Sequence, residues 1–441
     1  MQFSRRQFIR LSLTGLIGDP LVRGVADCYA YSQSPVVPRN TARTCIFVFM
    51  LGGPSQLETW DPKEGPWTPG DLDIRSYGGG VTLSHKLFPL LSRHIGDLVL
   101  LRSLQAWEAI HERGQYYLQT SYADHPALSR QLPCLGSVTA YESEGSRKQD
   151  DPFPPFFAIG VGDLLPLNAG FLSGRYAPFK MPFTSIGTGV PNLEPPADAN
   201  RLFKRIQLLE SLEGATPAPY GRQVDDNAAA GEWARPLLAR NLAPIFRVDK
   251  MESERYGNNY FGDQCLLARN IVRADSGARF IALFHGGWDQ HLGLFDRANP
   301  FNLFSQAAEF DTALGSLIED LKSGNLLNDT LIVAMGEFGR TPGPLNYRGG
   351  RDHYRGAQVA LMAGGGTRGP KAIGVTDPGG GFIVDYGWSG ERPIRMEDVA
   401  ATIYSALGIN WTKSISTPSG WTYEYVRHAE SDEYRPVDEV F

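Results

Sequence analysis

The sequence predicts an α/β protein with a largely parallel central sheet flanked by helices. Two observations lead to this prediction. Short continuous apolar runs recur along the chain, and stretches of helical period alternate with them. Continuous apolar runs are typical of parallel strands that are buried on both faces, and the alternation with helices is typical of a sheet covered on both sides. The 441 residues, 42% of them hydrophobic, are enough for a sizeable core.

The first 30 residues have the pattern of a targeting segment and are left out of the fold prediction. Ser4 to Phe8 read SRRQF, which resembles a twin-arginine export signal, and residues 8–17 form a modest apolar stretch. A small-residue cleavage site follows Ala30. The alternative is a basic cytoplasmic extension. We therefore expect a periplasmic or cell-envelope protein that uses the twin-arginine export machinery, with residues 31–44 as a linker.

Composition excludes several classes of function. Removing residues 1–30 takes away four arginines and two aspartates, which changes the formal charge from −6 to −8. Since no basic run follows the N-terminus, nucleic acid is not an expected partner. No apolar run is long enough to span a bilayer. Cys45, Cys134 and Cys265 lie far apart in the sequence, so neither a cysteine zinc cluster nor a disulfide framework is indicated.

The first predicted core strand covers Cys45 to Leu51 and ends at Gly52 and Gly53. Two glycines at a strand end allow close approach of a ligand, although they also simply make a tight turn. A second strand is expected from Asp97 to Leu101. A helix from Ala109 to Tyr122, which carries His111, would begin at the same edge of the sheet, where its N-terminus is suited to an anion.

Residues 141–260 are predicted to form an irregular insertion. Proline, glycine and aromatic residues are dense from Asp151 to Pro196, as in a structural cover or a substrate lid. Helical periodicity returns from Ala197 to Glu213 and again from Asp263 to Ala274.

The next predicted strand, Arg279 to Phe284, runs into a concentration of ligand-type residues. His285, Asp289 and His291 follow it within seven positions, in a chain with only eight histidines. Carboxylate and imidazole together suit zinc, manganese or iron, whereas calcium or magnesium prefers oxygen ligands only. The alternative is a structural histidine at the strand end and a packed loop. A helix from Phe304 to Lys322 follows.

The strand Leu331 to Met335 ends at Glu337, where ligands usually bind in open α/β sheets. Arg340 lies three residues further on. About one loop later come Arg351, Asp352 and His353, which combine metal-type ligands with a cation suited to an anion. The alternative is that Glu337 and Arg340 form an ion pair that holds the loop, with His353 an ordinary buried histidine.

The remaining predicted elements complete the sheet and its cover. We expect strands at Val359 to Ala363 and Gly381 to Asp385, and an amphipathic helix from Glu397 to Leu407 that ends before Gly408. Residues 429–441 are predicted to be a C-terminal tail.

Five motifs then carry a family resemblance. They are GGPSQLETWDP, GGWDQH, GEFGRTP, GRDHY and MEDVAATIYSALGI. In this order and spacing they resemble the bacterial family called domain of unknown function 1501, which is related to the sulfatases and the alkaline phosphatase superfamily. The resemblance implies an alkaline phosphatase/sulfatase-like sandwich over residues 45–428.

The resemblance also implies a metal site with a divalent ion. Its candidate ligands are Asp289, His291, Glu337, Asp352 and His353. Superfamily members carry aspartate ligands at the end of the first strand, where this chain has Gly52 and Gly53. Zinc, manganese or iron is expected in preference to calcium.

The nucleophile is where the chain departs from the sulfatase pattern. In an ungapped comparison with the sulfatase signature, His111 takes the place of the modified cysteine or serine, while Ser103 and Ser55 remain possible substitutes.

Three hypotheses follow. The first is a metal-dependent hydrolase of a sulfate, phosphate or related anionic ester, with His111, Arg340 and Arg351 as catalytic residues and the two arginines holding the anion. The second is a non-catalytic protein that binds an exported polysaccharide. The third is a structural partner of another exported protein.

Overall fold

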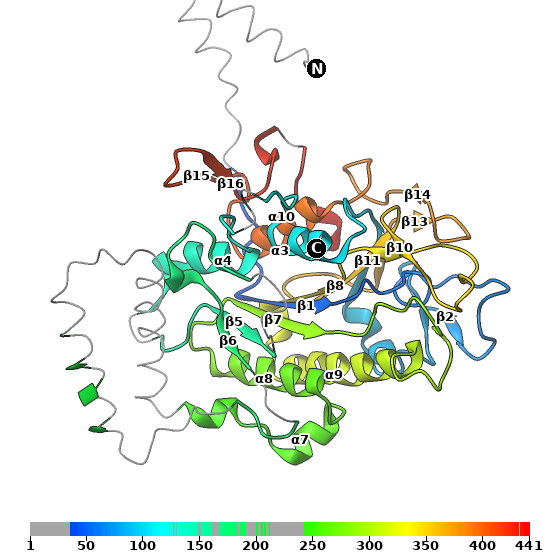
Figure 1. Ribbon diagram of the computed structural model, residues 1–441, viewed down its shortest axis with the longest axis horizontal. Coiled ribbons are helices and arrows are strands. Elements are labelled where there is room, and N and C mark those ends of the chain that lie inside the picture. The colour runs from blue at the N-terminus through cyan, green and yellow to red at the C-terminus, as the bar shows by residue number, and fades with distance from the viewer. Residues whose placement is uncertain are drawn as a thin grey trace, which may run out of the picture. The chain divides into compact units, whose positions relative to one another are not determined.

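Eight strands form the central sheet of the protein, seen here in a computed structural model (Figure 1). The structure describes residues 36–126, 128, 130–148, 151–160, 167–182, 186–190, scattered positions between 200 and 211, 242–431 and 433–441. The account below concerns the unit Pro38–Phe441. The predicted export signal and the predicted helix 197–213 lie wholly or largely outside the described residues.

The sheet is almost entirely parallel, as the sequence predicts. Its strands, in spatial order, are β12 (Lys371–Ile373), β4 (Leu98–Leu104), β11 (Gln358–Ala363), β8 (Thr330–Met335), β1 (Thr44–Met50), β7 (Phe280–His285), β5 (Phe156–Ile159) and β6 (Phe179–Met181). Only β11 runs antiparallel to its neighbours β4 and β8. In the centre, β1 pairs in parallel register with β7 on one side and β8 on the other.

Helices cover both faces of this sheet (Figure 1). One layer contains α8 (Tyr260–Ala274) and α9 (Leu303–Ser323), and the opposite layer contains α3 (His111–Thr120), α4 (Leu135–Ser143) and α10 (Met396–Ala406). Strand β1 shows why two layers are needed. Its residues alternate between the two apolar cores, with Phe47 in the core of α10 and Val48 in the core of α9. A strand that is apolar on both faces is stable only when both are covered.

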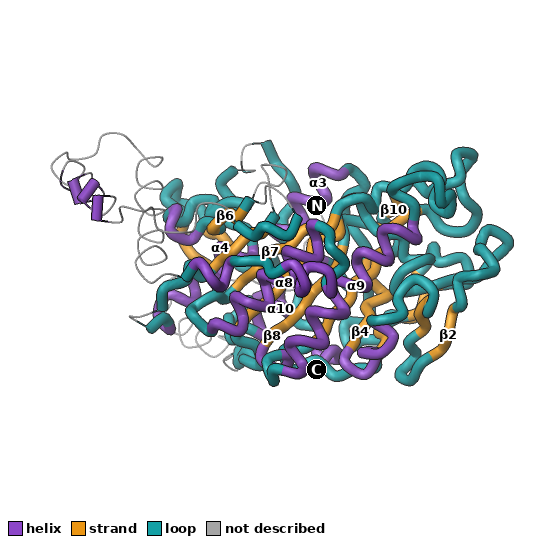
Figure 2. The backbone as a smooth tube through the Cα atoms, turned by 90° about the horizontal axis from the view of Figure 1, so that it is seen from below, coloured by secondary structure: helices purple, strands orange, loops and turns teal. Residues whose placement is uncertain are grey.

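Loops gather at the carboxyl ends of the parallel strands. In Figure 1 the arrowheads of β1 and β7 point toward the side where β10 and β13 lie, and Figure 2 shows the loops concentrated at the same end. Four small antiparallel pairs lie outside the central sheet in the described part of the chain. They are β2 (Ile74–Ser76) with β3 (Thr82–Ser84), β9 (Gly339–Arg340) with β10 (His353–Tyr354), β13 (Val375–Thr376) with β14 (Ile383–Asp385), and β15 (Ser414–Ser416) with β16 (Thr422–Glu424).

The structure corrects three of the predicted elements. The segment predicted as an irregular insertion contributes β5 and β6 to the central sheet and the short helix α7 (Lys250–Arg255) beside α8. The strand predicted to end at Leu101 continues to Leu104, because its pairing with β11 extends to Leu104 opposite Gln358. The strand predicted at residues 381–385 is present as the shorter β14, which pairs with β13 rather than with the central sheet.

The predicted C-terminal tail also packs on the domain. Val437 and Val440 are fully buried in the core that contains α10, and the backbone N–H of Val437 donates to Thr402 on that helix. None of the helices described is long and apolar enough to cross a membrane.

Candidate metal centre

Three adjacent strands bring the predicted ligands to one edge of the sheet. Asp289 and His291 lie in the loop after β7, and Glu337 follows β8, with β1 between these two strands. The carboxyl ends of neighbouring parallel strands meet at the same edge, so loops distant in sequence come together there. The hairpin β9–β10 then returns the chain and places His353 directly opposite Arg340.

The loop after β7 and the loop before β10 are joined backbone to backbone. Leu292 forms an isolated bridge with Gly349, and the Arg351 N–H donates to the carbonyl of Gln290 over 3.0 Å. Gly350 lies against His291 so closely that a Cβ there would be 2.2 Å from the His291 carbonyl carbon. This contact holds His291 beside Asp352 and His353.

Three imidazoles meet at one carboxylate oxygen. The Nε2 atoms of His111, His291 and His353 lie 3.3, 3.1 and 3.4 Å from Asp289 Oδ1. His291 Nε2 and His353 Nε2 are 2.9 Å apart. We call His111, Asp289, His291 and His353 the imidazole cluster. His111, Asp289 and His353 each offer one ligand atom, and these three atoms all lie within 4.8 Å of one another. Donor atoms around a shared metal ion have such spacing.

In each imidazole of the cluster, Nε2 faces Asp289 and Nδ1 contacts an oxygen atom on the opposite side of the ring. His111 Nδ1 lies 2.6 Å from Glu337 Oε1, and His291 Nδ1 lies 2.8 Å from Asp352 Oδ1. His353 Nδ1 donates to the carbonyl oxygen of Ala109 over 2.8 Å. In metal sites, an acceptor at one ring nitrogen fixes the tautomer and leaves the other nitrogen free to bind the ion. The same arrangement recurs at all three rings.

Glu337 lies behind His111, although the sequence predicts it as a direct ligand. Its side chain is 0% exposed and accepts the backbone N–H of Gly52 over 3.0 and 3.2 Å, together with Gln115 Nε2 over 3.3 Å. His111 therefore separates Glu337 from Asp289. Asp352 has a similar place behind His291, where it also accepts a hydrogen bond from Asn346. Neither carboxylate belongs to the imidazole cluster itself.

Arg340 and Arg351 are buried, and their hydrogen-bond donors point into the protein. Arg340 donates to the carbonyls of Gly52, Gly53 and Arg351 and lies 2.5 Å from Asp289 Oδ1. Arg351 forms a buried pair with Glu58 at 2.7 Å and donates to the carbonyls of Thr341 and Gly343. In this structure Arg340 contacts Asp289 and Arg351 contacts Glu58, and the role of these arginines in holding an anion stays a prediction.

Burial and neighbouring charges shift the pKa values of three residues of the cluster. Contacts with Asp289 and then Glu337 raise the pKa of His111 to about 9. Burial alone would raise the pKa of Asp289, but His111 and Arg340 outweigh that effect and lower it below its usual range. Burial lowers the pKa of His353, which favours its neutral, metal-binding form.

The residues fit a divalent transition metal. Three imidazole nitrogens and one carboxylate oxygen are the donor types that zinc, manganese and iron accept. His111 Nε2 is buried without a hydrogen bond of good geometry, although it lies 3.3 Å from Asp289 Oδ1. A buried nitrogen that lies beside a carboxylate without a well-formed hydrogen bond calls for an explanation, and a cation bound between the two would supply one.

The sequence predicts His111 as a catalytic residue but not as a metal ligand. The missing information was tertiary: the Ala109 carbonyl, Gln115 and Asn346 contact the site residues only after folding. The candidate nucleophiles Ser103 and Ser55 form no hydrogen bond with the imidazole cluster. Ser103 donates to the Tyr386 carbonyl, and the Ser55 hydroxyl is buried without a partner.

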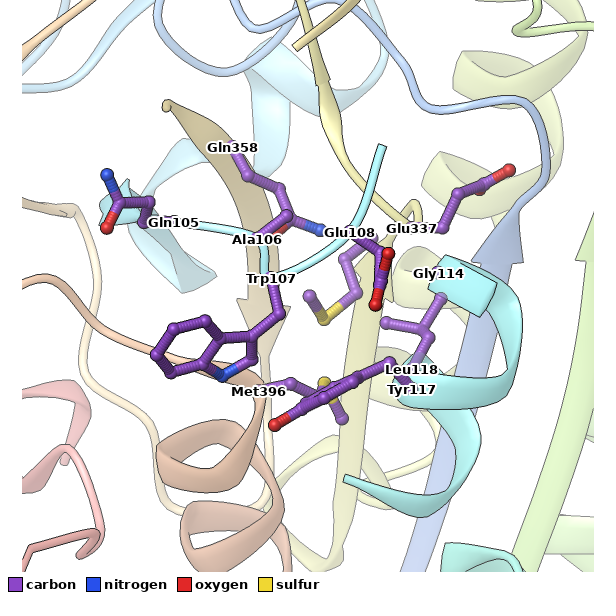
Figure 3. Close-up of a pocket in the computed structure, with 11 residues that line it drawn as sticks. Gln105, Ala106, Trp107, Glu108, Gly114, Tyr117, Leu118, Glu337, Gln358 and Met396 are labelled. Atoms are coloured by element: carbon purple, nitrogen blue, oxygen red, sulfur yellow. The ribbon is translucent and has the colours of Figure 1, made fainter. Parts of the chain in front are cut away.

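A small cavity lies beside Glu337 (Figure 3). Its volume is about 10 Å³, and it lies between α3, β8, β11, α10 and the segment that joins β4 to α3. Its lining residues are Gln105, Ala106, Trp107, Glu108, Gly114, Tyr117, Leu118, Met335, Glu337, Gln358 and Met396. The cavity adjoins the imidazole cluster through Glu337 but does not contain it.

Comparisons with known proteins identify the family. A protein-family model described as "Protein of unknown function (DUF1501)" matches residues 42–439. A comparison with curated protein sequences returns no match.

Solved structures with a similar chain path have low sequence identity. A protein in the alkaline phosphatase superfamily from Vibrio parahaemolyticus is 11% identical, with a TM-score of 0.41 and coverage of 85% of this chain and 69% of that one. The sulfatase PsFucS1 from Pseudoalteromonas sp. is 11% identical, with a TM-score of 0.38 and coverage of 89% and 72%. The lipoteichoic acid synthase LtaP from Listeria monocytogenes is 10% identical, with a TM-score of 0.40 and coverage of 94% and 99%. Because these TM-scores are below 0.5, they carry no argument about function.

Proposed function

The chain belongs to the DUF1501 protein family, and from this premise we propose that it is an exported, metal-dependent hydrolase of an anionic ester. The single observation that carries the proposal is the convergence of three imidazole Nε2 atoms on Asp289 Oδ1. Each ring is held at Nδ1 by an acceptor, so the donor atoms are positioned before any ion binds.

His111, Asp289, His291 and His353 would hold the ion. A divalent cation bound there would supply Lewis acidity toward an ester oxygen. Helix α3 begins at His111, so the positive end of its dipole adds to the attraction for an anion at the cluster. Arg340 keeps Asp289 in place, and Glu337 keeps His111 in the orientation that turns its Nε2 toward Asp289.

The substrate we expect is a sulfate, phosphate or related ester carried on a large molecule such as a polysaccharide. Asp289 is 48% exposed and the three imidazoles are each about a quarter exposed, so the cluster lies near the protein surface. A site of this kind is accessible to an ester group that projects from a polymer. The SRRQF sequence supports export by the twin-arginine route. Unchanged export in a strain without that machinery would contradict this part of the proposal.

A non-catalytic binding protein is the second candidate. One observation favours it: in the described part of the chain, the side chains that contact the imidazole cluster are carboxylates, Arg340 and aromatic rings, and no hydroxyl or thiol is among them. A covalent intermediate on serine, threonine or cysteine is therefore not supported by these contacts.

Metal content is the first test. The purified mature protein is expected to contain one equivalent of zinc, manganese or iron by plasma mass spectrometry. His353→Ala and Asp289→Asn remove one donor each and should lower the bound metal to a minor fraction. The control is His94→Ala, which removes a half-buried imidazole outside the cluster and should leave the metal content unchanged. A metal-free, folded wild-type protein would contradict the proposal.

Turnover separates the two candidates. Hydrolysis of an aryl sulfate or aryl phosphate is expected, with kcat lowered about 10- to 100-fold in Glu337→Gln, because His111 loses the carboxylate that orients it. Circular dichroism checks that the variant is folded. Stoichiometric metal with no turnover on either ester class would favour the binding protein.

A further inference from the structure

The segment Gln105–Ile110 contributes to the imidazole cluster at two points. The Ala109 carbonyl accepts the hydrogen bond that orients His353, and His111, the first residue of α3, directly follows Ile110. A displacement of this segment would therefore change the orientation of the His111 and His353 imidazoles. Its start is held by backbone hydrogen bonds from Gln105 to Ile394 and from Ala106 to Arg355.

Trp107 is the side chain that anchors the segment just before Ala109. Its indole N–H lies 3.2 and 3.3 Å from the two carboxylate oxygens of Glu397, in the first turn of α10. The Arg395 guanidinium carbon lies 3.8 Å from the centre of the indole ring, a cation–π contact. Trp107 is nevertheless 41% exposed, so core packing alone does not hold it in place.

Glu397 also holds α3. The Tyr117 hydroxyl donates to the same carboxylate, and Tyr117 lies on α3 about two turns after His111. In Figure 3 the Trp107 indole nitrogen and the Tyr117 hydroxyl point to the same side of the cavity. One carboxylate thus joins α10 to both the segment and the helix that carry site residues.

The carboxyl group of Glu397 is buried in the protein core, which is energetically unfavourable for a charged group. Glu397 is 2% exposed, and among the described residues no arginine, lysine or histidine forms a salt bridge with it. Burial accordingly raises the pKa of its carboxyl group to about 7. A buried carboxyl group without an ion-pair partner costs folding free energy, and such groups concentrate where function requires them.

We propose that Glu397 is a positioning residue that acts through Trp107 and Tyr117 to fix residues 105–111, and with them the imidazoles of His111 and His353. The inference rests on the proposed function in one respect: it takes the imidazole cluster to be the metal site. Glu397 itself does not touch the cluster.

Zinc affinity of the metal-stripped mature protein tests the inference. Glu397→Gln weakens the acceptor, and Trp107→Phe removes the indole N–H but keeps an aromatic ring for Arg395. The zinc Kd, measured by competition with a chromogenic chelator, is expected to rise about tenfold in both variants, as for other residues that orient ligands. The control is Thr402→Val on the same helix. Its buried hydroxyl bonds Asp398 and Val437 and should leave the zinc Kd within about twofold of wild type.

A second readout does not depend on metal. Selective ¹⁵N labelling of the eight histidines reports the tautomer and hydrogen bonding of each ring by NMR. In metal-free protein the His353 and His111 signals are expected to shift in Glu397→Gln and Trp107→Phe but not in Thr402→Val. Unchanged signals and an unchanged zinc Kd in both variants would overturn the inference. If wild-type protein binds no zinc while these signals still shift, the proposed function fails and the positioning role stands.

Discussion

Side chains at the candidate metal centre act in pairs, one facing the centre and one behind it. Glu337 lies behind His111 and Asp352 behind His291, while Arg340 fixes Asp289. The facing group supplies the donor atom and the group behind supplies its orientation. Hence two carboxylates that look like ligands in the sequence, Glu337 and Asp352, have a different role in the fold.

The pH dependence of stability should report the charge on His111. Contacts with Asp289 and Glu337 raise its pKa to about 9 from an ordinary value of 6.5. In metal-free protein this protonated ring stabilises the fold fully below pH 6.5, and the contribution is lost as the pH rises through 9. The ring is partly exposed, so we expect a contribution of about 1 to 2 kcal/mol.

Denaturant unfolding in the presence of a chelator measures this effect. The difference in unfolding free energy between wild type and His111→Gln is expected to shrink between pH 6.5 and 9. A difference that stays constant over this range would show that His111 is not charged by its neighbours.

At the scale of elements, two glycines allow the site to close. Gly52, at the end of β1, has a φ of +109°, and a Cβ there would lie 2.3 Å from the backbone nitrogen of Asp289. At Gly114 on α3, a Cβ would lie 3.0 Å from the Glu337 Cβ. These positions bring β1 against the loop after β7, and α3 against the loop after β8. The spacing of His111 and Asp289 depends on both contacts.

Gly52→Ala should destabilise the protein and weaken metal binding by more than the strain of a positive φ at an alanine would. We expect a loss of about 2 kcal/mol or more in unfolding free energy and a zinc Kd raised at least tenfold, because backbone atoms of Trp288 and Asp289 must move. The control is Gly420→Ala. Gly420 has a similar φ of +85° but no atom within 4 Å of an added Cβ. Equal effects of the two substitutions on zinc binding would contradict the expected role of Gly52.

Across the whole molecule, the chain end completes the core beneath α10. Val437 and Val440 are fully buried, and Arg39 near the start of the unit pairs with Asp438. Burial of a valine side chain stabilises a fold by roughly 1.5 to 3 kcal/mol. Residues 429–441 therefore contribute to the hydrophobic core and are part of the domain.

Deletion of residues 429–441 is expected to lower the unfolding free energy by at least about 3 kcal/mol, because the two valines alone contribute about that much and buried Tyr434 is lost with them. The control is Asp438→Asn, which breaks only the exposed pair with Arg39 and should cost less than about 1 kcal/mol. Chemical denaturation compares the two. A deletion variant as stable as wild type would mean that the segment is dispensable for the core.

Most strands and helices near the site could be predicted because their apolar pattern is local. The predicted strands at β1, β7, β8 and β11 and the helices α3, α9 and α10 agree with the structure within a few residues. By contrast, β5 and β6 have only four and three residues in a proline-rich region. Their pairing with β7 and with each other comes from the sheet rather than from any periodicity of their own.

The sequence by itself determined the fold class, the strand ends that carry ligand-type residues, and the family motifs. These depend on hydrophobic period and on residue type, which are properties of short segments. Only the tertiary structure decided which side chains face the centre. Glu337 and Asp289 are both carboxylates at strand ends, but His111 from a separate helix fills the space between them. Such an assignment depends on distances between segments remote in the chain, which no local pattern records.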